Sequence, residues 1–288
     1  MKNKDCCRLI LDMKRHGINV FGELGRYNYV NTQTILPHHS HPDIIEICYL
    51  AKGSQSYIVG DKTFRMFGGD IFISFPNEIH GTGNALEEKG ILYWIQLKRP
   101  EPGKEYLGLS YAMAEELFLR LLRLPERLFR GETQCEYLLQ KIFSVYFQSN
   151  DLLTVVELNN LYISFLLQVI HQGENITSRS FSDRIAKIIH YINDNIFEPL
   201  ELEELADKCN LSVSRFKHLF KEETGIPPSE YIIRKKVERA QELMKEQKYS
   251  IKNIAYDLGF SSPAYFSSVF KQYTGYSPTS YKRKGEKE

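Results

Sequence analysis

The chain has 288 residues, of which 42% are hydrophobic, and this is enough to build two ordinary domain cores. Its 37 Lys and Arg residues nearly balance 36 Asp and Glu residues, so the net charge is +1. This balance excludes a protein that binds nucleic acid through a large overall positive charge. Any such binding must depend on where the charges are placed.

The cysteines and the lack of long apolar runs predict a cytoplasmic protein without membrane contact. The five cysteines are odd in number and lack the C-x-x-C spacing of zinc sites, so we expect reduced thiols. The charged start of the chain is not followed by the apolar core of a signal peptide. No stretch approaches the ~20 apolar residues that a membrane span requires.

Residues 20–100 consist of short apolar runs that are separated by turn dipeptides. This pattern predicts a small β-barrel or sandwich. Gly60-Asp61 is the clearest tight hairpin, because the residues before it alternate as in a half-buried strand. The predicted strands are 44–50, 55–59, 63–67, 70–75 and 91–97.

Residues with ligand chemistry fall within this predicted barrel. His39, His41 and Glu46 begin the pattern H-x-H-x4-E-x6-G, and His80 with Asn84 gives H-x3-N. The region therefore resembles the cupin barrel. In enzymes of that superfamily, three histidines and a glutamate hold a divalent metal, which imidazole and carboxylate groups suit.

Three interpretations of these histidines and the glutamate remain open. They can orient a small molecule inside an apolar barrel, serve a purely structural role near strand ends, or bind a metal. We favour the ligand pocket and expect no cofactor. Two aromatic residues would add a flat surface for a sugar ring, although an aromatic side chain on a strand is more often core. The predicted effector-binding residues are His39, His41, Glu46, Tyr57, His80 and Trp94.

Residues 106–171 have the apolar periodicity of three helices. Part of this segment must pack against the barrel. The third helix has apolar residues on more than one face and is our candidate for a homodimer surface. Residues 172–182 are rich in small polar residues and predict a linker that would let two domains reorient.

The carboxyl-terminal part contains one pattern twice, in residues 202–231 and 251–281. Seven identities recur at a spacing of fifty residues, whereas Ala206 and Ser212 recur at forty-nine, as Ala255 and Ser261. Two helix-turn-helix units tolerate a one-residue difference within the turn, because the turn faces solvent while the helices must pack. The seven pairs are Phe216 and Phe266, Phe220 and Phe270, Lys221 and Lys271, Thr224 and Thr274, Gly225 and Gly275, Pro228 and Pro278, and Tyr231 and Tyr281.

Each copy predicts a second helix with one apolar stripe and one outward polar face. In the first copy, Ser212 stands where an N-cap belongs, and the helix should end at Gly225. Its outward face includes Lys217 and His218, whereas the equivalent face of the second copy is small and weakly polar. We therefore expect the first copy to recognise its target more selectively than the second.

The stretch between the copies predicts a third helix that starts at Pro228. About nineteen residues at ~1.5 Å each span roughly 28 Å, close to the ~34 Å of one DNA turn. The two outer helices could then enter successive major grooves. The basic residues of this connecting helix would contact phosphate, or would form a solvated face paired with Glu238, Glu242 and Glu246.

Residues 181–284 resemble the DNA-binding domain of the AraC/XylS family of bacterial transcription regulators, through the stretches 254–261, 265–271 and 275–278. The resemblance implies an all-helical domain that binds promoter DNA and usually activates transcription. It places base contacts at Ser214, Lys217 and His218 in the first unit and at Pro263, Ala264 and Ser268 in the second. The remaining predicted DNA contacts are Arg215, Lys221, Arg234, Lys235, Lys236, Arg239, Ser262, Ser267 and Lys271.

We therefore predict an α+β multidomain protein with a cupin-like β-barrel at 1–105, a helical segment at 106–171, a linker at 172–182 and an all-α double helix-turn-helix domain at 183–284. Its predicted function is sequence-specific transcription regulation as an activator, controlled by a sugar or related metabolite. The predicted partners are double-stranded promoter DNA, the effector, RNA polymerase and a second copy of the chain. The alternative is a metal-dependent cupin enzyme with an accessory helical domain.

Overall fold

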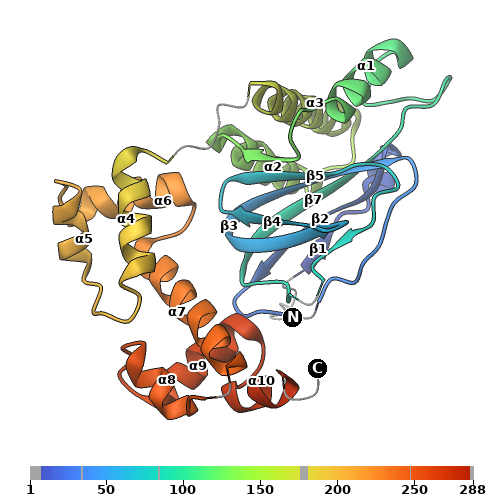
Figure 1. Cartoon of the computed structure of the whole chain (residues 1–288). Coiled ribbons are helices and arrows are strands. Elements are labelled where there is room, and N and C mark those ends of the chain that lie inside the picture. The colour runs from blue at the N-terminus through green and yellow to red at the C-terminus, as the bar shows by residue number, and fades with distance from the viewer. Residues whose placement is uncertain (1–7, 34, 84, 176–180, 247, 286–288) are drawn as a thin grey trace. The chain divides into compact units, whose positions relative to one another are not determined.

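The computed structural model describes residues 8–33, 35–83, 85–175, 181–246 and 248–285. The chain divides into two compact units (Figure 1). The first unit comprises residues 1–29, 36–85 and 90–179, and the second comprises 30–35, 86–89 and 180–288. The predicted Asn84 and residues 176–180 of the predicted linker lie outside the described residues.

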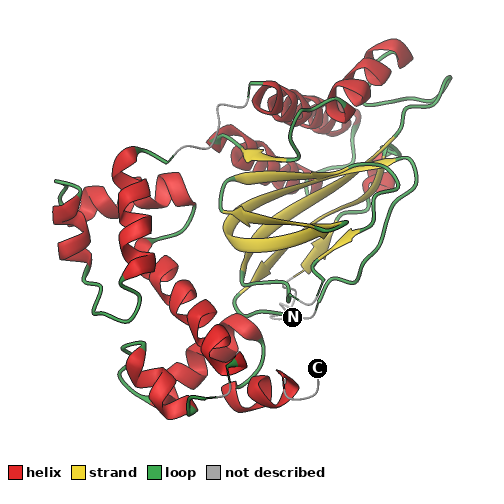
Figure 2. Ribbon diagram, viewed as in Figure 1, coloured by secondary structure: helices red, strands yellow, loops and turns green. Residues whose placement is uncertain are grey.

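The first unit is built on an antiparallel sheet, followed in the chain mainly by helices (Figure 2). The strand order is β1-β2-β7-β3-β5-β8, and β4 and β6 also pair with β3. The strands are β1 Arg8–Ile10, β2 Phe21–Tyr29, β3 Ile44–Val59, β4 Lys62–Phe67, β5 Asp70–Ser74, β6 His80–Gly81, β7 Gly90–Lys98 and β8 Leu128–Arg130. The helices are the short 3-10 helix Met13–His16, α1 Tyr111–Leu122, α2 Thr133–Tyr146 and α3 Leu152–Glu174.

The central strand β3 joins two strands that were predicted separately. Gly53, with a φ of 103°, and a register shift against β7 between Leu50 and Lys52 bend this strand without ending it. Its first half pairs with β5 and β7, and its second half pairs with β4 and β6. The antiparallel β domain is thus confirmed. Among the described strands no pairing joins β1 to β8, so closure into a barrel stays a prediction.

Alternate residues of the sheet face two different clusters. Ile45, Ile47 and Tyr49 belong to a large core that also holds the buried faces of α1, α2 and α3, which lie on one side of the sheet (Figure 1). Cys48 and Leu50 point the other way, into a cluster with aromatic side chains of β2, β5 and β7. We call this second surface the inner face, and it positions the candidate ligand residues.

Helix α3 has the length and hydropathy of a helix that could cross a membrane. Eight of its residues are buried, and among them Leu158, Tyr162 and Phe165 pack in the large core of the first unit. The side chain of Asp151 caps its first turn by accepting a hydrogen bond from the Thr154 amide at 2.8 Å. Packing in this core, mainly against α2, therefore accounts for part of its apolar composition.

The second unit is helical, apart from short segments, and contains both predicted helix-turn-helix units. Its helices are α4 Asp183–Asp194, α5 Leu202–Lys208, α6 Val213–Thr224, α7 Pro228–Lys245, α8 Ile251–Asp257, α9 Pro263–Thr274 and α10 Pro278–Gly285. Ser212 accepts a hydrogen bond from the Arg215 amide and caps α6 as predicted. In the second copy Ser262, rather than the repeat partner Ser261, caps α9. The one-residue difference between the two copies thus falls in the turn before the second helix of each copy.

The two helix-turn-helix units have separate cores that are joined by α7. Phe216 and Phe220 are fully buried in a cluster with residues of α4 and α5 and the start of α7. Phe266 and Phe270 are fully buried in a second cluster with α8 and the later part of α7. Helix α7 therefore contributes one face to each core, and this fixes the position of α6 and α9 relative to it.

Candidate functional site

Helix α6 presents the polar residues that were predicted for the first helix-turn-helix unit. Phe216 and Phe220 occupy its buried stripe, as the periodicity predicted. His218 Nδ1 lies 3.5 Å from Glu222 Oε2, one turn further along the exposed face. The exposed residues are Ser214, Arg215, Lys217, His218 and Lys221. The outward face thus combines three cations with hydrogen-bonding groups, which suits base and phosphate contacts.

Helix α9 presents a smaller surface. Ala264, Ser268 and Lys271 are exposed. Two hydroxyls on this side are already used within the helix, since Ser262 Oγ accepts from the Tyr265 amide at 3.2 Å and Ser267 Oγ donates to the Pro263 carbonyl at 2.8 Å. Few side-chain donors are then left for base edges. This difference between α6 and α9 agrees with the weaker polarity read from the sequence.

The basic residues of α7 pair with glutamates of the same helix. Lys235 bonds Glu238 at 2.8 Å and Arg239 bonds Glu242 at 2.7 Å, both at a spacing of three residues. Burial lowers the pKa of Lys236. Arg234 departs furthest from its predicted role, because its side chain is buried and bonds Glu230 on the preceding turn at 2.9 Å. Because this guanidinium is not exposed to solvent, the prediction that Arg234 contacts phosphate is not supported.

Two exposed tyrosines in the second helix-turn-helix unit were not predicted as site residues. Tyr256 on α8 and Tyr265 on α9 are 52% and 50% exposed. Both lie off the apolar stripes of their helices, and this was the signal in the sequence that could have identified them.

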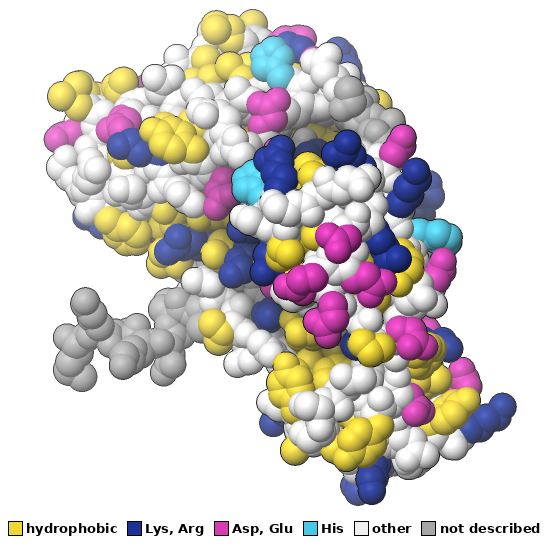
Figure 3. All heavy atoms as spheres, turned by 90° about the vertical axis from the view of Figure 1, so that its left-hand side faces the viewer, with side chains coloured by type: hydrophobic (Ala, Val, Ile, Leu, Met, Phe, Trp, Pro, Cys, Tyr) yellow, Lys and Arg dark blue, Asp and Glu magenta, His cyan; other side chains and the backbone are white. Residues whose placement is uncertain are grey.

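On the face of the molecule in Figure 3, Lys and Arg side chains are interspersed with acidic and hydrophobic ones. This agrees with the net charge of +1 of the whole chain.

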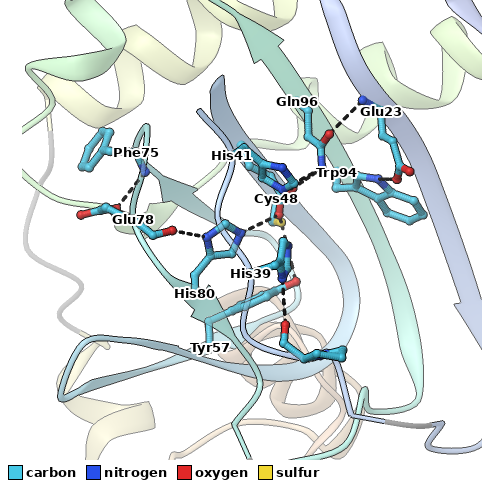
Figure 4. A network of polar contacts seen from close by, with 12 residues as sticks. Glu23, His39, His41, Cys48, Tyr57, Phe75, Glu78, His80, Trp94 and Gln96 are labelled. Carbon is cyan, nitrogen blue, oxygen red and sulfur yellow. Dashed lines mark hydrogen bonds and ion pairs between the residues drawn. The ribbon is translucent and has the colours of Figure 1, made fainter. Parts of the chain in front are cut away.

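On the inner face of the first unit, three histidines and one glutamate converge (Figure 4). His39 and His41 precede β3, Glu46 lies on β3 and His80 lies on β6. One ligand atom from each residue lies within 4.8 Å of all the others. Glu46 and His80 are buried, whereas His39 and His41 are half-buried. We call these four residues the polar cluster, and the structure brings them together as the sequence predicted.

Backbone carbonyls determine which ring nitrogens face the cluster. His39 Nδ1 donates to the Pro37 carbonyl at 2.8 Å, and His80 Nδ1 donates to the Glu78 carbonyl at 3.0 Å, because a carbonyl can only accept. The Nε2 atom of each ring is therefore left for the cluster. His80 Nε2 lies 3.5 Å from Glu46 Oε1, is buried, and has no hydrogen-bond partner among the described residues.

The surroundings of Glu46 favour its ionised form. Burial alone would raise its pKa, but the nearby imidazoles of His41 and His80 and the hydrogen bond from Gln96 outweigh burial and hold the pKa well below its usual value. Burial alone would likewise lower the pKa of His80, but the Glu46 carboxylate and the Glu78 carbonyl raise it. The cluster therefore contains a buried carboxylate that depends on its three polar neighbours.

Gln96 of β7 is a member of this site that the sequence analysis missed. Its Nε2 donates to Glu46 Oε2 at 2.8 Å and lies 3.1 Å from His41 Nε2, while its Oε1 accepts from the Glu23 amide at 3.0 Å. Because Oε1 accepts, the Nε2 end must face the cluster. The alternation of Leu92, Trp94 and Gln96 on one strand face was the signal for this residue.

Tyr57 and Trp94 lie on the inner face near the polar cluster (Figure 4), but both are buried. The Tyr57 ring stacks on Phe72 with its centroid 4.9 Å away. Trp94 Nε1 donates to Glu23 Oε2 at 3.4 Å, and the Arg8 guanidinium lies 4.5 Å from the indole centroid. Each ring thus already has a neighbour on at least one side, and stacking on a sugar remains a prediction for them.

A cavity of about 350 Å³ lies elsewhere in the first unit, near Val20, Lys98, Tyr106 and Asn159. It is lined by none of the predicted effector residues. The polar cluster, unlike this cavity, brings together four of the predicted effector residues with convergent polar groups and shifted pKa values, which are features of functional sites.

Comparison with known proteins identifies both halves of the chain. Residues 20–129 match the AraC-like ligand binding domain, and residues 205–284 match a helix-turn-helix domain. The chain is 27% identical to the transcriptional regulator YfiF of Bacillus subtilis, over 87% of this chain and 79% of that protein. It is 27% identical to the Msm operon regulatory protein of Streptococcus mutans, over 82% of this chain and 83% of that protein.

Two further similarities concern an activator and a DNA complex. The chain is 23% identical to the transcriptional activator RhaS of Escherichia fergusonii, over 85% of this chain and 87% of that protein. The DNA-binding domain of AdpA, solved in complex with a target DNA, is 29% identical, with a TM-score of 0.35, over 36% of this chain and 93% of that one. The family consists of transcription regulators rather than enzymes, so the alternative of a cupin enzyme is not retained. The chain belongs to the AraC family of transcription regulators, with an AraC-like ligand-binding domain ahead of a DNA-binding helix-turn-helix domain.

Proposed function

We propose that this regulator controls transcription in response to a small molecule bound at the polar cluster. The observation that carries this proposal is the cluster itself, in which four polar side chains converge beside apolar and aromatic residues of the inner face. Small-molecule sites combine such a lining with a few convergent polar groups. Imidazole and carboxylate groups pair well with hydroxyls, so the proposed effector is a sugar or a related metabolite.

The proposed site lies in a barrel of the cupin-like kind that opens at the polar cluster. The half-buried His39 and His41 would form the open side, and the buried Glu46 and His80 would form the floor. An effector entering there would meet these half-buried histidines first. Its hydroxyls would then replace contacts that the cluster residues make with one another.

We propose that α6 reads bases and that α9 mainly contacts the DNA backbone. The exposed Lys217 and His218 on α6 support this division, as does the small face of α9 around Ala264 and Ser268. Lysine and histidine can donate to guanine acceptors in the major groove, whereas alanine offers only apolar contact, for example with a thymine methyl group. Lys236 of α7 is assigned to phosphate, which positions the protein without reading sequence.

Binding of randomised DNA by purified variants tests this division. Lys217→Ala or His218→Ala should relax the preference at individual base pairs, by about 1–3 kcal/mol at each contacted pair. Lys236→Ala should weaken binding to all sequences alike. Lys187→Ala serves as the control, because Lys187 is exposed on α4 outside the assigned face. An equal loss of affinity for every sequence in all three variants would refute the assignment.

The proposed mode of action is activation by a cytoplasmic homodimer that contacts RNA polymerase. The description of the RhaS relative as an activator supports activation here. The exposed Leu152, Leu153 and Val156 at the start of α3 support a dimer surface on that helix. Leu153→Lys should then shift the chain from dimer to monomer in sedimentation velocity. An unchanged sedimentation coefficient would exclude this part of α3 as the interface.

Control by the effector is tested by the thermodynamic linkage between effector binding and DNA binding. An effector that changes DNA affinity must itself bind with a different affinity when DNA is present. Genomic fragments selected by the purified chain would suggest candidate effectors through the genes beside them. Calorimetric titration of each candidate, with and without the selected DNA, then measures whether DNA changes the affinity for the effector. Identical affinities in both conditions, for every effector that binds, would refute the proposed switch.

A further inference from the structure

The polar cluster has the donor set of a transition-metal site. Metal ions of the first transition row bind imidazole nitrogen and carboxylate oxygen at about 2.0–2.2 Å, so two ligands of one ion lie roughly 3–4 Å apart. His41 Nε2 lies 3.4 Å from Glu46 Oε2, and His80 Nε2 lies 3.5 Å from Glu46 Oε1. The four ligand atoms lie within 4.8 Å of one another, so small side-chain movements would bring all of them around one ion.

The orientation of the imidazole rings is a second observation that indicates an ion. Histidines that bind a metal usually donate their other ring nitrogen to a carbonyl or carboxylate. His39 and His80 do this through Nδ1, to Pro37 and Glu78, and both therefore direct Nε2 into the cluster (Figure 4). His80 is 1% exposed and its Nε2 has no hydrogen-bond partner among the described residues. A buried nitrogen without a partner is costly unless something else occupies that position.

Burial and charge also fit a cation. The Glu46 carboxylate is almost fully buried, and its ion pairs among the described residues are with the imidazoles of His41 and His80, at 3.4 and 3.5 Å. A buried charge needs a partner of opposite sign or a metal. Gln96 holds Glu46 Oε2 in place and is itself fixed by the Glu23 amide, as expected for a residue that orients a metal ligand.

We propose that the polar cluster binds one divalent ion of the first transition row, such as zinc, iron or manganese. The ligands are Nε2 of His39, His41 and His80 and the carboxylate of Glu46. Because His39 and His41 are half-buried, the ion keeps coordination positions on the side that faces solvent. Those positions would bind water or oxygen atoms of the effector, and this last step rests on the proposed effector site. Gln96 is a positioning residue, since it acts on the ion through Glu46.

The metal content of the purified full-length chain tests this inference. The protein is stripped with a chelator, loaded with zinc chloride, desalted and measured by mass spectrometry of the element. We expect one zinc ion per chain in the wild type. His41→Gln and Glu46→Gln should lose the ion, whereas His38→Gln should keep it, because His38 is an exposed neighbour outside the cluster. Equal zinc content in the wild type and His41→Gln, or none in either, would overturn the inference.

Cobalt binding gives a second measurement that a merely structural role would not change. Divalent cobalt coordinated by imidazole and carboxylate has visible absorption bands, and these bands should be present in the wild type and absent in His41→Gln. His41 is half-buried, so this variant should fold, and circular dichroism of the metal-free proteins should match. Gln96→Leu should retain the bands but weaken affinity by about 10- to 100-fold. An unchanged affinity in Gln96→Leu would refute the positioning role.

The metal and effector proposals can fail separately. A chain that binds no metal but still responds to an effector would leave the effector proposal intact. A chain that binds metal but has the same DNA affinity with and without every effector would retain only the metal site.

Discussion

Replacing Phe216 with alanine should open one helix-turn-helix core and leave the other closed. Phe216 is fully buried in the cluster of α4, α5 and α6, whereas its repeat partner Phe266 is fully buried in the separate cluster of α8 and α9. Removing a buried phenylalanine costs about 3–5 kcal/mol. Since 1.4 kcal/mol corresponds to a factor of ten, the opening equilibrium of the first core should rise roughly 100-fold to 4,000-fold.

Hydrogen exchange of the full chain, followed by mass spectrometry, measures this opening separately in each core. In Phe216→Ala, peptides from α4 to α6 should exchange faster, and peptides from α8 and α9 should keep the wild-type rate. Phe266→Ala is the matched control and should give the reverse pattern. An equal acceleration in both sets of peptides for either variant would mean that the second unit opens as one cooperative body. It would refute the idea of two separable cores.

Three other predictions concern a cap, a turn and a thiol. Gly225 has a φ of 77°, so Gly225→Ala should lower the free energy of unfolding of the second unit by about 1–2 kcal/mol in urea titrations, and no change would contradict this. Hydrogen bonds from Thr154 and Ser149 lower the pKa of Asp151, so its stabilising contribution is present above pH 4 and is lost as pH falls through the lowered pKa. Asp151→Ala should therefore lower the melting temperature at pH 7, with a difference from the wild type that narrows at pH 3; a constant difference would contradict the charged cap. Burial raises the pKa of the Cys135 thiol to about 12, so iodoacetamide at pH 8 should modify it only after denaturation, and rapid labelling of the native chain would refute its burial.

The repeat made the helical unit the more predictable part of the chain. Its periodicity predicted the buried Phe216 and Phe220 and the exposed Lys217 and His218, because an amphipathic helix shows its faces directly in the sequence. Reliance on periodicity alone also led to the wrong prediction for Arg234, which was expected to contact phosphate but is buried. Periodicity gives the side of a helix on which a residue lies, but not whether a carboxylate such as Glu230 on the preceding turn will bind it.

The sheet was harder to predict in detail. β6 and β8 contain two and three residues, which is too short for any alternation to be visible. The polar cluster itself could be predicted, because His39, His41 and Glu46 stand close together in sequence. Gln96 could not be placed with them, since its pairing to Glu46 depends on the register between β3 and β7.

The position of His80 in the site is set by the register of a two-residue strand. β6 pairs Val59 with His80 and Ile58 with Gly81, and a slip of one residue would turn the imidazole to the opposite side of the sheet. A side chain at Gly81 would come within 2.9 Å of the Pro37 carbonyl oxygen, on the segment that brings His39 beside His80. A single-residue insertion or deletion between β5 and β6 would therefore abolish the site while every cluster residue is kept. Relatives that retain all four residues but differ in the length of this turn should accordingly have lost the function of the site.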